Sequence, residues 1–174
     1  NYCFKVFVRR GTDWSDGVST CVTPNLTYCT SNGNTTYNTS VTNVTLNTIN
    51  NNSVKPSGYS DYTAISTNLT AGLSYTLSVS VNTAGDYEVD GYAWIDFNQN
   101  GLFTDAGEFF NLGSAQNVVS GATISSPLSI AIPANAVLGT TRMGITASYD
   151  TGINSCSTAF DGEVEDYTIN ILAG

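Results

Sequence analysis

The sequence contains no histidine, and only 5 of its 174 residues are Lys or Arg, against 14 that are Asp or Glu. Without histidine, a catalytic site would lack the commonest general base. A formal net charge of −9 with so few basic residues is unsuited to nucleic acid or to an anionic membrane surface. No segment approaches the ~20 apolar residues that span a bilayer. We therefore expect no nucleic-acid partner and no membrane insertion.

Charge of either sign is also scarce, because only 11% of the residues are charged. Thr, Ser, Asn and Gly keep the chain polar instead, which is typical of a secreted β-protein. We recognise no signal peptide and interpret the sequence as a mature or excised segment. Its length is sufficient for one domain with its own core, with room for a short appendage.

The four cysteines also point to an extracellular or cell-surface protein. They form no Cys-x-x-Cys pair, and without histidine a zinc site would need all four at unsuitable spacings. An even number predicts two disulfides, for which three pairings are possible. We favour Cys3–Cys21, which closes a local loop, and Cys29–Cys156, which ties the start of the main domain to the segment before its last strand.

Alternating apolar and polar residues predict many short strands and no long helix. In residues 74–81, for example, Tyr75, Leu77, Val79 and Val81 fall on one face. The expected strands span residues 4–9, 39–46, 74–81, 91–97, 122–132, 140–147 and 163–172. Short strands separated by Gly, Asn and Asp turns favour an all-β fold, an antiparallel β-sandwich of jelly-roll type.

The N-terminal 27 residues differ from the rest in charge. Lys5, Arg9 and Arg10 lie within the first ten residues, whereas only Lys55 and Arg142 are basic thereafter. We therefore expect residues 1–27 to be an appendage or the end of a preceding domain, and residues 28–174 to form the sandwich.

Residues 96–108 have the composition of a calcium-binding loop. Oxygen-bearing side chains occupy positions 1, 3 and 5, a glycine follows at 6, and carboxylates occupy 10 and 13. Calcium takes six to eight oxygen ligands, which such a loop can supply. The predicted ligands are the side chains of Asp96, Asn98 and Asn100, the Leu102 carbonyl, and one or both of Asp105 and Glu108. The loop is not an EF-hand, because position 12 is Gly107. The alternative is an Asx-rich turn without metal.

The segment 162–169, Gly-Glu-Val-Glu-Asp-Tyr-Thr-Ile, resembles the signature of the GEVED domain. Further matching segments occur in the same order: Tyr28-Cys29, residues 59–63, residues 94–101, residues 107–108, residues 132–133, residues 141–143 and Cys156. The resemblance covers about residues 28–172. It implies a β-sandwich accessory module of secreted and surface proteins of Bacteroidota and related bacteria, found beside peptidase, glycoside hydrolase or adhesion domains and without catalytic activity.

Glu165 is expected to begin on the buried side of the last strand, because it shares parity with Tyr167, Ile169 and Ile171. A buried carboxylate needs a partner. Arg142 is the only basic residue after Lys55, so we expect an ion pair of Arg142 with Glu165 or with Asp61. A second metal site in this acidic segment is the alternative.

The same acidic segment raises the question of catalysis. Two carboxylates flanking a glycosidic bond suffice for a glycosidase, and Asp161, Glu163, Glu165 and Asp166 lie close together in sequence. These acids belong to the resembling motif, however, which implies a structural role. The sequence also has no Gly-x-Ser-x-Gly nucleophile elbow and no phosphate-binding loop. We expect that the chain is not an enzyme.

The aromatic residues are the remaining candidates for ligand binding, because flat rings stack against sugars. Trp14 lies in a turn, and Tyr92 and Trp94 share one face of an expected strand, where structural packing competes with binding. Two functions stay open. One is a calcium-stabilised, non-catalytic module that binds a polysaccharide or surface glycan for a larger secreted protein. The other is a structural spacer or adhesion domain with no glycan ligand of its own.

Overall fold

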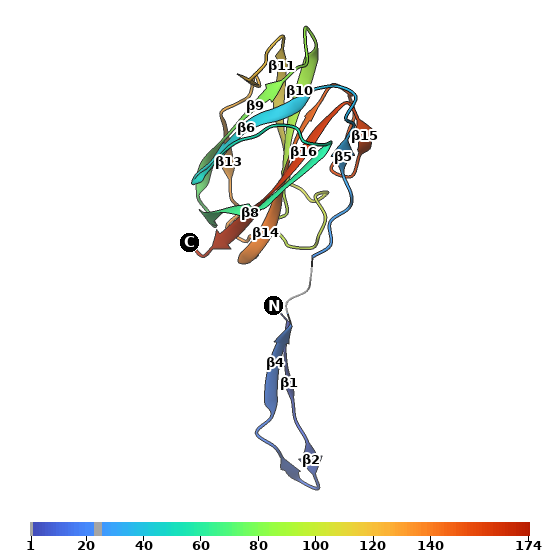
Figure 1. Ribbon diagram of the computed structural model, residues 1–174. Helices are drawn as coiled ribbons and strands as arrows, with labels where there is room; N and C mark the ends of the chain where they lie inside the picture. The colour runs from blue at the N-terminus through green and yellow to red at the C-terminus, as the bar shows by residue number, and fades with distance from the viewer. Residues whose placement is uncertain (1, 23–25) are drawn as a thin grey trace.

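The computed structural model describes residues 2–22 and 26–174, and every regular element in them is a strand. Two five-stranded sheets pack face to face (Figure 1). The first, here called the β16 sheet, has the order β11 (Phe109–Gln116), β10 (Glu88–Ile95), β14 (Gly139–Ser148), β16 (Gly162–Leu172) and β8 (Tyr59–Thr70). The second, the β9 sheet, contains β12 (Gly121–Ala122), β13 (Leu128–Ala131), β9 (Ser74–Asn82), β6 (Ser40–Leu46) and β7 (Ile49–Asn52).

The core lies between the two sheets and follows the predicted alternation. Leu77 and Val79 of β9 are fully buried, as are Ile145 of β14 and Ile169 of β16. Apolar side chains at every second position remove one face of each strand from water, at about 25 cal/mol per Å². The predicted all-β sandwich is confirmed.

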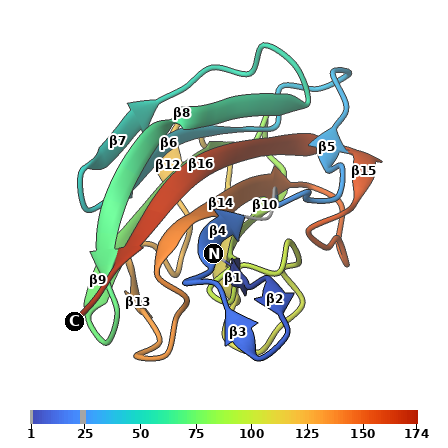
Figure 2. The same ribbon diagram turned by 90° about the horizontal axis from the view of Figure 1, so that it is seen from below.

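Within the two large sheets, one pairing departs from the predicted antiparallel jelly roll. β8 runs parallel to β16, with a bulge between Tyr167 and Thr168. Figure 2 shows β8, β16 and β14 side by side in that order. Parallel neighbours need a long connection. Here the connection from β8 to β16 contains strands β9 to β15. Both strands end together, since the Ala71 amide donates to the Leu172 carbonyl at 2.9 Å.

The strand predicted over residues 122–132 is in fact two short strands, β12 and β13. A turn at Ser126, whose amide donates to the Thr123 carbonyl at 2.9 Å, separates them. Both strands pair with β9. Within the two large sheets, the sequence prediction also missed β7, β8 and β11, whose polar residues blur the period-two pattern. Among the described residues no helix is long and apolar enough to cross a membrane.

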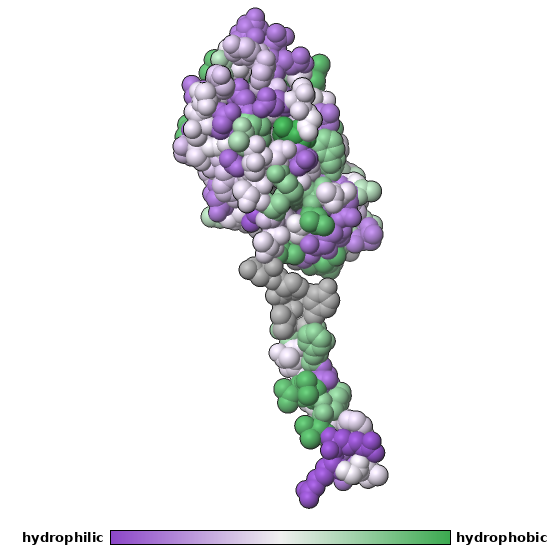
Figure 3. Space-filling view, turned by 90° about the vertical axis from the view of Figure 1, so that its right-hand side faces the viewer, coloured by the Kyte–Doolittle hydropathy of each residue, from purple (hydrophilic) through white to green (hydrophobic). Residues whose placement is uncertain are grey.

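The N-terminal residues form a separate two-stranded hairpin (Figure 1). β1 (Tyr2–Val6) pairs with β4 (Val18–Val22), and β2 (Arg9–Arg10) pairs with β3 (Asp13–Trp14). Figure 3 shows hydrophobic side chains along this hairpin and hydrophilic ones at its tip. An isolated hairpin is marginally stable in water, and here the Cys3–Cys21 disulfide joins the two strands. Residues 1 and 23–25 of the predicted N-terminal strip lie outside the described residues.

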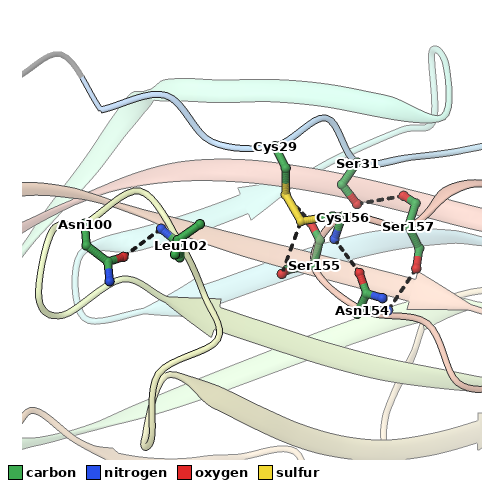
Figure 4. Close-up of a disulfide and its surroundings, with 8 residues drawn as sticks. All are labelled: Cys29, Ser31, Asn100, Leu102, Asn154, Ser155, Cys156 and Ser157. Atoms are coloured by element: carbon green, nitrogen blue, oxygen red, sulfur yellow. Dashed lines mark hydrogen bonds between the residues drawn. A yellow bond between two sulfur atoms is a disulfide. The ribbon is translucent and has the colours of Figure 1, made fainter.

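The second disulfide, Cys29–Cys156, fastens the start of the sandwich to the loop before β16 (Figure 4). Beside it, the Ser31 hydroxyl donates to the Ser157 carbonyl at 3.0 Å. The parallel pair β5 (Asn32–Gly33) and β15 (Thr158–Phe160) continues this contact. Both predicted disulfide pairings are confirmed.

Removing the Cys29–Cys156 bridge should destabilise the sandwich strongly, because it joins residues 127 positions apart. The chain-entropy model gives a loss of about 4–5 kcal/mol in the free energy of unfolding. Urea unfolding of the Cys29→Ser/Cys156→Ser double variant, followed by tryptophan fluorescence and circular dichroism, measures it. The matched control is Cys3→Ser/Cys21→Ser, which opens only the hairpin and should leave the sandwich transition unchanged. Equal effects of the two double variants would contradict this assignment.

Candidate functional site

The loop of residues 96–108 connects β10 to β11 at one end of the sandwich. Its tight turn depends on Gly101, whose φ of +83° is in the left-handed region. A Cβ at this position would lie only 3.1 Å from the Thr27 carbonyl oxygen. The loop therefore packs closely against the segment that enters the sandwich from the N-terminal side.

Asp96 is fully buried at the first position of this loop and organises the backbone around it. Its Oδ1 accepts a hydrogen bond from the Asn100 amide at 3.2 Å, and its Oδ2 accepts one from the Gly101 amide at 2.9 Å. The Tyr28 hydroxyl also donates to Oδ2, at 2.9 Å. Three donors thus fix the position of the Asp96 side chain at the start of the loop.

Glu108 closes the loop from its other end and is only 2% exposed. Its Oε1 accepts hydrogen bonds from the amides of Phe97 at 2.8 Å and Asn98 at 3.3 Å. Its Oε2 is buried and has no hydrogen-bond partner among the described residues. Burial is the main cause that raises the pKa of this carboxyl above its usual value. A buried, half-satisfied carboxylate is costly unless another group completes it.

The remaining predicted ligands surround Asp105. The side-chain amides of Asn98 and Asn100 donate to Asp105 Oδ2 at 3.0 and 2.8 Å. The Asn100 side-chain oxygen accepts from the Leu102 amide at 2.8 Å (Figure 4). The structure thus brings all six predicted ligand residues into one loop.

This donor set fits a calcium ion better than a transition metal. Among residues 2–22 and 26–174, no three His, Cys, Asp or Glu side chains converge closely enough to hold a metal by themselves. Calcium, in contrast, accepts amide and carbonyl oxygens beside carboxylates. The unpartnered Oε2 of Glu108 is the oxygen that such an ion would complete.

Tyr28 connects the loop to the outer face of the β16 sheet. The Tyr28 hydroxyl donates a hydrogen bond to Asp96, and the Tyr28 ring stacks on Phe103 with 5.0 Å between the ring centroids. The Arg142 guanidinium lies 4.4 Å from the same ring centroid on the sheet side. Sequence reasoning gave Tyr28 no role in the site, although it had marked Tyr28-Cys29 as part of the resembling pattern.

Arg142 pairs with Asp166, which corrects the predicted partners Glu165 and Asp61. The Arg142–Asp166 distance is 3.2 Å, and the Tyr59 hydroxyl donates to the same Asp166 oxygen at 2.9 Å. The reason is strand alternation. Asp166 faces outward opposite Gly144 of β14, whereas Glu165 faces the core opposite Ile145. The Asp61 carboxylate instead accepts from the amide and hydroxyl of Thr63 at 2.9 and 2.7 Å.

A pocket of ≈ 320 Å³ opens beside this ion pair on the outer face. We call it the Arg142 pocket. Its main side chains are Tyr28, Tyr59, Trp94, Phe103, Arg142 and Asp166. The pocket is adjacent to the 96–108 loop, because Tyr28 and Phe103 belong to both. Its charged groups already neutralise each other.

The predicted aromatic ligand residues do not form one site. Trp94 is only 5% exposed and packs against Tyr92 and Phe109, with ring centroids 5.8 and 5.7 Å away. Trp14 is 63% exposed on the hairpin, where the Arg9 guanidinium lies 5.5 Å from its ring centroid. Packing therefore accounts for Trp94, and only Trp14 presents an open indole.

Glu163 and Glu165 of the acidic segment are both fully buried between the sheets. Glu163 accepts from the Ser60 hydroxyl at 2.7 Å and the Val41 amide at 3.2 Å. Glu165 accepts from the Tyr167 hydroxyl at 2.6 Å. Burial, reinforced by the charge of Glu165, raises the pKa of Glu163 to about 7 although both hydrogen bonds oppose it. Burial therefore favours the protonated form of these carboxyl groups in the folded protein, and the free energy of unfolding depends on pH.

The sandwich should lose stability as the pH rises from about 4.5 to about 7, because unfolded Glu163 ionises near 4.5 and folded Glu163 near 7. At about 1.4 kcal/mol per pKa unit, the loss is on the order of 3 kcal/mol. Urea unfolding at pH 4.5, 6 and 8 measures it. Glu163→Gln keeps both contacts, since the Ser60 hydroxyl can accept instead of donate, and should flatten the profile. An unchanged slope in this variant would assign the pH dependence to other groups.

The GEVED domain family model matches residues 90–170, from β10 to β16. The match includes the 96–108 loop, Arg142, the disulfide cysteine Cys156 and the acidic segment, but not Tyr28 or β8. No curated protein matches the chain. The matched region thus begins in β10, which leads into the 96–108 loop, and ends in β16, which begins at Gly162. The resemblance to the GEVED domain family seen in the sequence is therefore confirmed over residues 90–170.

Proposed function

We propose that this chain is a calcium-stabilised, non-catalytic module that binds neutral polysaccharide on behalf of a larger secreted or cell-surface protein. The observation that supports it best is the 96–108 loop, where a buried Glu108 oxygen has no partner among the described residues. Asp96, the two asparagines and Asp105 supply further oxygen atoms around that loop. Oxygen ligands of this kind are those that calcium prefers.

The role of the metal in this proposal is structural. When bound, calcium supplies positive charge to a loop whose acids Asp96, Asp105 and Glu108 otherwise repel one another. The chain's own residues position that loop: Tyr28 donates to Asp96, and the Thr141 hydroxyl donates to the Asp96 carbonyl at 2.6 Å. Stiffening the loop also stiffens the Arg142 pocket, which shares Tyr28 and Phe103 with it.

The absence of catalysis is supported by where the acidic side chains lie. Glu163 and Glu165 face the core and bond Ser60, Val41 and Tyr167. Asp166 is held by Arg142 and Tyr59. A glycosidase needs two carboxyl groups that flank a substrate cleft, whereas Glu163, Glu165 and Asp166 make structural contacts. Oε1 of Glu165 and Oδ1 of Asp161 have no hydrogen-bond partner among the described residues.

A secreted location is supported by the two disulfides, which persist in oxidising compartments. Binding of a glycan is supported by aromatic rings that stand open on a surface rich in Thr, Ser and Asn; the most exposed are Phe4, Phe7, Trp14, Tyr37, Tyr87, Phe109 and Tyr149. The net charge of −9 favours a neutral polymer over a polyanion.

The second candidate is a spacer or adhesion domain without a glycan ligand. It is favoured by one observation, the burial of Trp94 against Tyr92 and Phe109. In that case calcium and disulfides would only stiffen the module.

Calcium should raise the melting temperature of the native protein by several degrees, because binding to the folded state alone stabilises it by mass action. Differential scanning calorimetry in calcium and in chelator measures the difference. Glu108→Gln keeps an oxygen for the Phe97 amide but removes the charge, and Asp96→Ala removes a ligand; both should abolish the calcium response. Glu88→Gln, an exposed substitution outside the loop, is the control and should retain it. No calcium response in the native protein would refute the metal site.

Neutral polysaccharides should retard the protein in affinity electrophoresis, whereas sulfated or uronic-acid polymers should not unless calcium is added. The physical reason is the acidic surface, which repels polyanions. Trp14→Ala tests whether the hairpin indole contributes to binding. Failure of every polymer to retard the native protein would leave the spacer function in its place.

A further inference from the structure

A second pocket, of ≈ 420 Å³, lies at the opposite end of the sandwich from the 96–108 loop. The two ends are defined by β10, which begins after Tyr87 and ends before Asp96. We call this cavity the tyrosine pocket. Its lining residues are Asn34, Tyr37, Thr39, Ala84, Tyr87, Tyr149, Asp150 and Asp161. None of them was among the ligand residues predicted from the sequence.

The three tyrosines of this pocket stand open to solvent. Tyr87 is 53% exposed and Tyr149 is 46% exposed, and Tyr37 is similarly open. The rings of Tyr87 and Tyr149 meet edge to face, with 5.5 Å between centroids and 79° between planes. This arrangement leaves ring faces free beside a concave surface, which is where the apolar face of a sugar packs.

The walls of the pocket are held in place before any ligand arrives. The Tyr149 amide donates to the Asp161 carbonyl at 2.8 Å, and the Asp161 amide donates to Asp150 Oδ2 at 2.9 Å. On the other side, Lys55 Nζ donates to the carbonyls of Tyr37 and Thr39, each at 2.9 Å. Such preorganisation lowers the entropic cost of binding.

Several polar groups of the pocket, in contrast, have no hydrogen-bond partner within the described part of the chain. Oδ1 of Asp161 is buried and has no partner among the described residues. The phenolic hydroxyls of Tyr37, Tyr87 and Tyr149 likewise make no hydrogen bond within the described part of the chain. The pocket thus offers carboxylate acceptors together with hydroxyl groups that both donate and accept.

This combination selects the class of ligand. No basic side chain is among the described residues that line the pocket. The Lys55 ammonium group, which bonds the Tyr37 and Thr39 carbonyls, interacts with the charge of Asp161. Two carboxylates against this one positive charge still disfavour an anion. An amine would use only the carboxylates and ring faces, and leave the hydroxyls without a role. Adjacent hydroxyl groups of a neutral sugar donate to a carboxylate and exchange hydrogen bonds with phenols, while the C–H face of the ring packs on tyrosine.

We propose that the tyrosine pocket is the glycan-binding site of this chain and holds one neutral pyranose residue, stacked on Tyr87 or Tyr149, with two of its hydroxyls donating to Asp161 and Asp150. This inference rests on the proposed polysaccharide binding and assigns the binding site to the tyrosine pocket. It also separates that site from the calcium loop by the length of the sandwich.

The test uses isothermal titration calorimetry and affinity electrophoresis of the full chain with a soluble β-glucan, an arabinoxylan and a galactomannan. The variants are Tyr87→Ala, Tyr149→Ala and Asp161→Asn, and each should weaken binding about tenfold or more, as expected when a central aromatic or a buried acceptor is lost. Tyr149→Phe retains the ring and should lose less. Leu73→Ala removes a large apolar side chain that is as exposed as Tyr87 but lies outside the pocket, and it should bind like the native protein. Melting curves of each variant establish that it is folded.

The outcomes separate this inference from the function on which it rests. Binding by the native protein that survives all three pocket variants would overturn the tyrosine pocket but leave polysaccharide binding intact. No binding by the native protein would overturn both. A third outcome is that no sugar binds, whereas tetramethylammonium binds the native protein and binds Tyr87→Ala and Tyr149→Ala more weakly. The pocket would then be a cation site, and the sugar assignment would be wrong.

Discussion

The Asp96 carboxylate is the constraint on which much of this structure depends. Buried at the end of β10, it receives hydrogen bonds from the amides of Asn100 and Gly101 and from the Tyr28 hydroxyl. The first two bonds shape the 96–108 loop, and the third fixes the segment that leads into the sandwich. Removing the carboxylate would leave these donors unsatisfied in a buried position, which is costly. Through Tyr28, the same group also orients Phe103 and Arg142.

Strand alternation explains why an acidic motif can serve stability rather than chemistry. Along β16, Glu163 and Glu165 face the core, whereas Asp166 faces the outer surface and pairs with Arg142. Each carboxyl group therefore meets different partners although the residues are nearly consecutive. The inward pair depends on Ser60, Val41 and Tyr167 for its hydrogen bonds. These contacts tie β6, β8 and β16 together across the two sheets.

The sequence was informative wherever a physical rule acts locally. Period-two alternation located β9, β10 and β14, and the regular spacing of Asp96, Asn98 and Asn100 marked the loop. Cysteine number and position also led to the correct pairings.

The parallel contact of β8 with β16 was not predictable, because it joins segments that are about a hundred residues apart. The partner of Arg142 was missed for a related reason: parity along β16 indicates a face, but only the register with β14 indicates which acid lies within reach. The tyrosine pocket combines four separate segments, and no local pattern unites Tyr37, Tyr87 and Tyr149.

We propose different tasks for the two ends of the sandwich. One end would hold calcium and stiffen the fold, and the other would bind a sugar on preorganised tyrosines. The most direct test of the metal-dependent half is a crystal structure of the full chain grown in calcium chloride, with anomalous scattering to identify the ion. We expect one calcium in the 96–108 loop, about 2.3–2.6 Å from oxygens of Asp96, Asn98, Asn100 and Glu108. A loop that contains only water, with both asparagine amides still donating to Asp105, would contradict it.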